Sequence, residues 1–140
     1  MYYEDASTAI AWLCRAFGFE VRVKIEHDGQ VAHSQLVLDG GMIMVGSAGG
    51  APARPERAHC VSPRAVDGQN TQGLCAFVDD ADAHCERARA AGATIAAEPA
   101  TQDHGPEYWA DRTYEAVDLE GHHWFFIQRL RSATPSDADS

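Results

Sequence analysis

Two copies of one pattern occur in this chain, and this internal repeat limits the folds that it can adopt. Asp5-Ala6 returns as Asp80-Ala81 after 75 residues, and Gly18 returns as Gly92 after 74 residues. Around these positions each copy predicts a strand, a helix and three further strands. One such unit leaves a face of its sheet open, whereas two units, from one chain or from a dimer, can close around a cavity. The repeat therefore predicts an α+β fold of two βαβββ units, whose mixed sheets curve around a cavity with the helices outside.

The first unit is predicted to span about residues 1–46. Asp5 is a good N-cap for its helix, and Gly18 is a suitable residue to end it. The apolar face of this helix consists of residues at helical spacing: Ile10, Leu13, Cys14 and Phe17. Trp12 lies one position off that face and is expected to reach a dimer or tail contact. Alternating apolar and polar residues predict the three strands over residues 19–26, 31–38 and 42–45.

The second unit is predicted to span about residues 73–130. It begins with a buried strand over residues 74–78 and continues with a helix that starts after Asp80 and ends at Gly92. A strand over residues 94–97 is expected to stop before Pro99. A hairpin follows, with strands over residues 108–117 and 123–128. Trp124 and Phe126 alternate away from Phe125, so we expect them in the core under a helix.

A long connecting loop is predicted between the units, over residues 47–72. The segment has no apolar period and contains Gly49-Gly50 and three prolines. Loops of this length are often functional or mobile, and the sequence leaves open whether this one is a lid. The two units form a single expected domain over residues 1–130, and the polar residues 131–140 are expected to be a disordered tail.

The charge of the chain limits the partners that it can have. Its 21 acidic and 11 basic residues give a formal net charge of −10. Such a surface repels nucleic acid and anionic lipid, so neither is expected as a partner, whereas a cationic ligand would be tolerated. The chain has no apolar run of about 20 residues and no secretory signal, which predicts a cytoplasmic protein with four free cysteines.

Five segments in order carry a family resemblance. They are the first helix with the residues after it, Val31-Ala32-His33-Ser34, Gly41-Met42-Ile43-Met44-Val45-Gly46, the second helix with its flanks, and the closing hairpin with Trp109-Ala110-Asp111-Arg112 and Asp118-Leu119-Glu120-Gly121-His122-His123-Trp124. Over about residues 2–128 the chain resembles the vicinal-oxygen-chelate superfamily, which includes the glyoxalase and bleomycin-resistance proteins. This superfamily contains lyases, dioxygenases, thiol transferases and drug-binding proteins, so the resemblance implies the fold more strongly than the activity.

The resemblance implies where a metal would bind in the metal-dependent members of the superfamily. Their first-strand ligand would lie upstream of Met1, and the other three positions fall on Met44, near Gly73 and on Phe125. Glycine and phenylalanine offer no donor, and a thioether is a poor ligand for a hard or borderline ion. We therefore expect no metal and no cofactor at this site.

The residues expected to contact a ligand fall into two groups, and no catalytic residue can be assigned. An adaptable wall is predicted from Met42, Met44, Cys75, Phe77 and Phe125. Polar and stacking contacts are predicted from His33, Gln35, Trp109, Arg112 and Tyr114, with Arg112 as an anchor for a carboxylate or carbonyl group. His123 shares a strand face with Phe125 and could also look into the cavity.

The sequence and the resemblance together favour one function and leave others open. The favoured function is a metal-free small-molecule-binding protein of the bleomycin-resistance type, which sequesters or carries a hydrophobic or cationic natural product. The alternative is a glyoxalase-like lyase, isomerase or dioxygenase that acts on a small metabolite. A third hypothesis is a relative with an occluded cavity that only dimerises. The resemblance also implies a homodimer in which paired units build the cavity.

Overall fold

The fold was analysed in a computed structural model, which describes residues 1–133. The first unit consists of β1 (Tyr2–Tyr3), α1 (Ala6–Phe17), β2 (Glu20–His27), β3 (Gln30–Leu38), β4 (Gly41–Met44) and β5 (Gly46–Ser47). The second consists of β6 (Leu74–Phe77), α2 (Ala81–Ala90), β7 (Thr94–Asp103), β8 (Ala110–Val117) and β9 (His123–Arg131). This order confirms the predicted α+β fold of two βαβββ units, with β5 as an addition. From residue 134 on, the tail expected over residues 131–140 lies outside the described residues.

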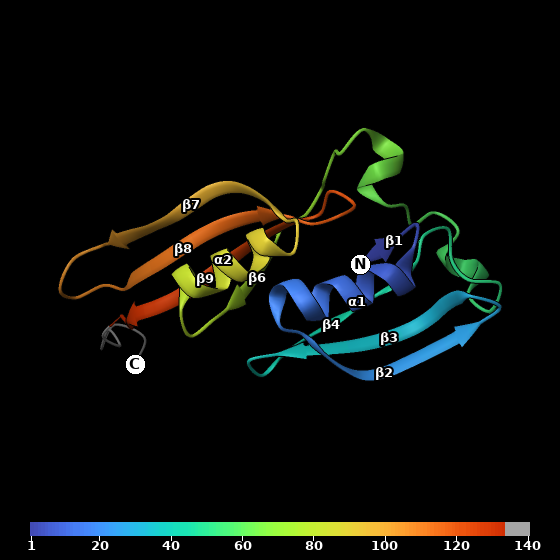
Figure 1. Ribbon diagram of the computed structural model, residues 1–140, viewed down its shortest axis with the longest axis horizontal. Helices are drawn as coiled ribbons and strands as arrows, with labels where there is room; N and C mark the ends of the chain where they lie inside the picture. Colours follow the sequence, from blue (N-terminus) through green and yellow to red (C-terminus); the bar gives the residue numbers. More distant parts are fainter. Residues whose placement is uncertain (134–140) are drawn as a thin grey trace, which may run out of the picture.

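The strands form three sheets. In the first unit, β2, β3 and β4 pair in an antiparallel sheet, and β1 pairs in parallel with β5. In the second unit the order is β6-β9-β8-β7, in which β6 and β9 are parallel and the other pairs are antiparallel. Figure 1 shows the units side by side along the long axis of the molecule, with α1 and α2 next to each other near the centre.

Both helices begin and end where the sequence predicts. The side chain of Asp5 accepts a hydrogen bond from the backbone N–H of Thr8, and Asp80 accepts one from that of Ala83. Gly18 ends α1 in the left-handed region at φ 85°, which costs glycine little because it has no Cβ. Neither helix in the described residues is long and apolar enough to cross a bilayer.

The core lies where the two helices meet the second sheet. Phe17 of α1 contacts the rings of Trp124 and Phe126, which confirms that these two residues lie in the core. The indole Nε1 of Trp12 donates a hydrogen bond of 2.7 Å to the carbonyl of Ala91, at the end of α2. The expected dimer or tail contact of Trp12 is therefore wrong, because its side chain is buried between the units. Each helix covers one face of its sheet, and the other face of each sheet is open.

Two predicted segments differ from the structure. Strand β7 does not stop before Pro99 but continues to Asp103, because it is the edge strand and a register shift between Ala97 and Ala100 accommodates the proline. The connecting segment is not irregular throughout, since it contains the single-turn helices η1 (Pro55–Arg57) and η2 (Pro63–Val66). Each begins with a proline, whose fixed φ favours the first helical position.

Candidate functional site

The open face of the first sheet brings three predicted residues together. Strand pairing sets Gln35 opposite Met44, and the side chains of His33 and Gln35 lie 3.3 Å apart between their Nε2 atoms. The open face also carries apolar side chains that are about half exposed, namely Ile25 (44%), Met42 (50%) and Met44 (53%). Exposure of so many large apolar groups on one sheet face is typical of a surface that receives a ligand or a partner.

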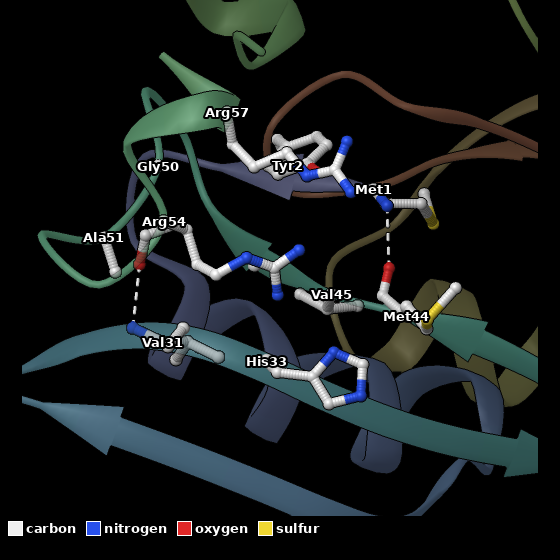
Figure 2. Close-up of a pocket in the computed structure, with 13 residues that line it drawn as sticks. Met1, Tyr2, Val31, His33, Met44, Val45, Gly50, Ala51, Arg54 and Arg57 are labelled. Carbon is white, nitrogen blue, oxygen red and sulfur yellow. Dashed lines mark hydrogen bonds between the residues drawn. The ribbon is translucent and has the colours of Figure 1, made fainter.

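A pocket of about 140 Å³ lies beside this face, where β1 and the connecting segment meet β3 and β4. Its walls include Tyr2, His33 and Met44 from the strands, and Arg54 and Arg57 from η1 and the residue before it. Figure 2 shows both arginine side chains reaching from the segment above toward the strands, with Arg54 above His33 and Arg57 beside Tyr2. We call this the arginine pocket. It is a local concentration of positive charge in a chain with a net charge of −10.

Burial and hydrogen bonding define the polar groups of the arginine pocket. Nε of Arg54 donates a 2.6 Å hydrogen bond to Glu56, and this bond raises the pKa of Arg54. Burial raises the pKa of Tyr2, so its hydroxyl remains a neutral donor at neutral pH. In residues 1–133, the buried side-chain nitrogen or oxygen without a hydrogen-bond partner is Nε of Arg57.

The open face of the second sheet brings together the other three predicted wall residues. Cys75 pairs with Phe125 across β6 and β9, and Phe77 follows on the same face of β6. Cys75 is exposed, and the rings of Phe77 and Phe125 are 49% and 39% exposed. A Cβ on Gly73 would lie 3.0 Å from the Phe125 ring, so glycine leaves the space that this ring occupies. A hollow of about 390 Å³, the Phe125 hollow, is lined by Gly73, Glu115, His123 and Phe125, with the segment from Gly68 to Gln72 at its edge.

Glu115 and His123 form a polar pair on the wall of the Phe125 hollow. Nδ1 of His123 donates a hydrogen bond of 2.8 Å to Oε1 of Glu115, and strand pairing sets Glu115 opposite Phe125. The carboxylate fixes the tautomer of the imidazole and leaves Nε2 for a further contact. His123 therefore lies where the alternation of β9 predicts, and Glu115 is its unexpected partner.

Three predicted ligand contacts lie away from both open faces. Tyr114 is 2% exposed, and its hydroxyl donates a 2.5 Å hydrogen bond to Nδ1 of His84 on α2. Arg112 makes two hydrogen bonds to Asp82, also on α2, of 2.7 and 2.9 Å. Trp109 contacts His104 at the end of the β7–β8 hairpin. The prediction that these three residues line one ligand pocket is therefore wrong, because Tyr114 and Arg112 lie on the face of β8 that packs against α2.

The positions where related proteins hold a metal do not fit one here. Gly73 and Phe125 have no donor atom, and the thioether of Met44 is a poor ligand for a hard or borderline ion. Within residues 1–133, no group of three His, Cys, Asp or Glu side chains is arranged to hold a metal ion.

Sequence reasoning did not identify Arg54, Arg57 or Glu115 as site residues. A signal for the two arginines exists, because Pro55 predicts a helical turn and residues three apart on such a turn lie on one side. Their position over β3 depends on the path of the connecting segment, which the sequence does not specify. Alternation places Glu115 on the same face of β8 as Thr113 and Val117. Only the register of the β8–β9 hairpin shows that Glu115, of these three residues, lies opposite Phe125.

Comparison with known proteins gives one family-model match and a set of similar solved structures. The model of the Glyoxalase/Bleomycin resistance protein/Dioxygenase superfamily matches residues 1–126. Among solved structures, the chain is similar to TioX from Micromonospora sp. ML1, with 34% sequence identity, coverage of 93% of this chain and 94% of that chain, and a TM-score of 0.66. A search among curated proteins gives no match.

More distant structures share the fold alone. UcmS2 is 20% identical, with a TM-score of 0.63 and coverage of 91% of this chain and 92% of that one. A member of the same superfamily from Sphaerobacter thermophilus is 19% identical, with a TM-score of 0.60 and coverage of 91% of both chains.

Proposed function

The chain belongs to the Glyoxalase/Bleomycin resistance protein/Dioxygenase superfamily, and on this premise we propose that it binds a small molecule against the open faces of its two sheets. The finer proposal is a protein of the bleomycin-resistance type that sequesters or carries a hydrophobic natural product. The observation that carries it is the set of apolar side chains left exposed on both faces: Ile25, Met42, Met44, Phe77 and Phe125. Methionine side chains adapt to irregular ligands, and phenylalanine rings stack on flat ones.

We propose further that two copies of the chain form the binding cavity. The arginine pocket takes all its lining from residues 1–57, and the Phe125 hollow takes all of its lining from residues 68–125. Each open face therefore needs a second surface to enclose a ligand. A homodimer in which the first unit of one copy faces the second unit of its partner would supply that surface twice, by symmetry.

Titration with a neutral aromatic dye tests the proposal. Phenylnaphthylamine, which fluoresces in apolar surroundings, is expected to bind the full chain at a saturable, stoichiometric site. Phe125→Ser should weaken this binding about tenfold, because it removes a ring that buries apolar area. Val61→Ser is the matched control, since Val61 is a similarly exposed apolar residue of the connecting segment. Absence of saturable binding by the dye and by a panel of aromatic metabolites would contradict the function.

A second function is supported by the Glu115–His123 pair. A carboxylate that orients an imidazole is a common arrangement for general base catalysis, and this pair borders the Phe125 hollow. The second candidate is therefore a lyase or isomerase in which Nε2 of His123 removes a proton from a small metabolite. Turnover of a hemithioacetal that is lost in His123→Gln would support it, and metal analysis of the purified protein would separate it from a metal-dependent reaction.

A further inference from the structure

We propose that the arginine pocket binds an oxyanion of the ligand, a carboxylate, sulfonate or phosphate group, while the apolar part of the ligand lies on the adjoining sheet face beside Met44. This inference rests on the proposed binding function and names the chemical class of ligand. The ligand class is thus anionic, although the net charge of −10 would tolerate a cationic ligand.

Hydrogen-bond donors converge on the arginine pocket from two sides. Arg54 and Arg57 reach into the pocket from one side, and His33 and Tyr2 line it from the strands (Figure 2). Guanidinium groups present several N–H donors in a plane and match the geometry of carboxylate and phosphate oxygens. Two of them beside an imidazole and a phenol form a site with many donors and a positive charge.

The Nε of Arg57 is buried and has no hydrogen-bond partner in residues 1–133. A charged donor without a hydrogen-bond partner costs more free energy when it is buried than when it is exposed to water. A buried donor in a folded protein is therefore expected to have a partner. An oxyanion in the pocket would satisfy it after a small rotation of the Arg57 side chain. Glu56 does not serve this purpose, because its hydrogen bond goes to Nε of Arg54 and its side chain is 56% exposed.

The backbone holds the two arginines over the strands before a ligand binds. Gly49 and Gly50 both have positive φ, and a Cβ on Gly50 would lie 2.3 Å from the carbonyl oxygen of Arg54. The segment is closed by a hydrogen bond of 2.6 Å from the N–H of Gly49 to the carbonyl of Cys60. This turn brings η1 close to the sheet before any ligand arrives, which lowers the entropic cost of binding.

A pair of dyes tests the proposal. Anilinonaphthalene sulfonate carries a sulfonate on the skeleton of phenylnaphthylamine, so the two probes differ in the anionic group. Arg57→Gln and Arg54→Gln are each expected to weaken binding of the sulfonate dye about tenfold and to leave that of the neutral dye nearly unchanged. Arg22→Gln is the control, because Arg22 is exposed on β2 outside the pocket. Competition by acetate and by inorganic phosphate then ranks the two natural oxyanions.

The outcomes separate this inference from the function on which it rests. If both dyes bind and the arginine variants leave the sulfonate dye unaffected, or weaken both dyes equally, the oxyanion pocket is wrong and the binding function stands. If neither dye binds, the binding function is wrong, and a phosphate titration followed through the Nε–H NMR signal of Arg57 decides the pocket by itself. A saturable shift of that signal, absent for Arg22, supports the pocket, and no shift overturns it.

Discussion

The hydroxyl of Tyr3 donates a hydrogen bond of 2.6 Å to Oδ2 of Asp118 in the other unit. The same oxygen accepts a hydrogen bond of 3.0 Å from the indole of Trp124. The second oxygen, Oδ1, accepts the backbone N–H groups of the turn, at Glu120, Gly121 and His122. One buried carboxylate thus fixes the turn before β9 and joins it to β1 of the first unit.

Asp118→Asn is expected to lower the free energy of unfolding by about 2–4 kcal/mol. The amide keeps the size of the side chain but turns an NH₂ group toward donors, which leaves buried donors without an acceptor. Urea denaturation followed by tryptophan fluorescence measures the change. Tyr3→Phe is the graded comparison, because it removes one donor and should cost about 1 kcal/mol. An unchanged urea midpoint in Asp118→Asn would show that the buried carboxylate does not hold the two units together.

Acidification below pH 6.5 is expected to destabilise the protein through His84. Burial lowers the pKa of His84 from 6.5, the Phe17 carbonyl opposes this, and Arg87 adds to it. The unfolded chain therefore takes up the proton at a higher pH than the folded protein does. The contribution of the neutral ring to stability is complete above pH 6.5 and is lost as the pH falls through the lower folded value. The free energy of unfolding in urea should fall between about pH 7 and about pH 5.

His84→Gln separates this effect from other titrations. The variant is expected to be less stable at neutral pH, because it loses the hydrogen bonds to Tyr114 and to the Phe17 carbonyl. Its stability should depend less on pH in the same window. Carboxylates such as Asp5 and Asp82 do not interfere, because hydrogen bonds lower their pKa values below 3.8. Equal slopes for the two proteins would contradict the role of His84.

Gly50→Ala is expected to weaken binding of the sulfonate dye several-fold, and Gly49→Ala is expected to leave it unchanged. Both glycines have positive φ, of 75° at Gly49 and 74° at Gly50, so both variants incur a backbone cost of about 1 kcal/mol. A Cβ on Gly49 meets nothing within 4 Å, whereas one on Gly50 would collide with the Arg54 carbonyl. The difference between the variants therefore measures the displacement of η1 alone. Equal dye affinities would show that the path of this segment does not position the arginines.

Local signals predicted the elements of the fold better than they predicted the site. Asp5 and Asp80 lie directly before apolar helical periods, so the start of each helix follows from a few neighbouring residues. Alternation within β3 likewise places His33 and Gln35 on one face without knowledge of the rest of the chain. The predicted ligand contact of Tyr114 is wrong, because the face of Tyr114 depends on its pairing with Phe126, and this pairing is set by the length of the turn between β8 and β9.

The arginine pocket could not be predicted for a related reason. Arg54 lies in the connecting segment over residues 47–72, which has no apolar period to fix its path over His33. Its position is set by the Gly49–Gly50 turn and by hydrogen bonds such as that of Gly49 to Cys60, which involve the backbone and leave little trace in residue type. Prediction of a site that a loop forms over a sheet therefore requires the three-dimensional structure.

Introducing a charge on each open face tests the proposed homodimer. The full chain, of 15.2 kDa, is expected to sediment with twice that mass. Met44→Glu and Phe125→Glu should each shift it toward the monomer, because each would bury a carboxylate on an apolar face without a partner. Val61→Glu, on a similarly exposed residue away from both faces, should leave the mass unchanged.

Rescue of the dimer identifies which faces meet. If the first unit of one copy faces the second unit of its partner, Met44→Glu combined with Phe125→Arg places opposite charges across the interface and should restore part of the dimer. If like faces meet instead, the combined variant sets like charges opposite each other on both faces and stays monomeric. If the wild-type chain sediments as a monomer at all concentrations, the proposed cavity has no second wall and the homodimer is wrong. The dye would then have to bind on one open face, so only one of the two variants, Phe125→Ser or Met44→Glu, would weaken its binding.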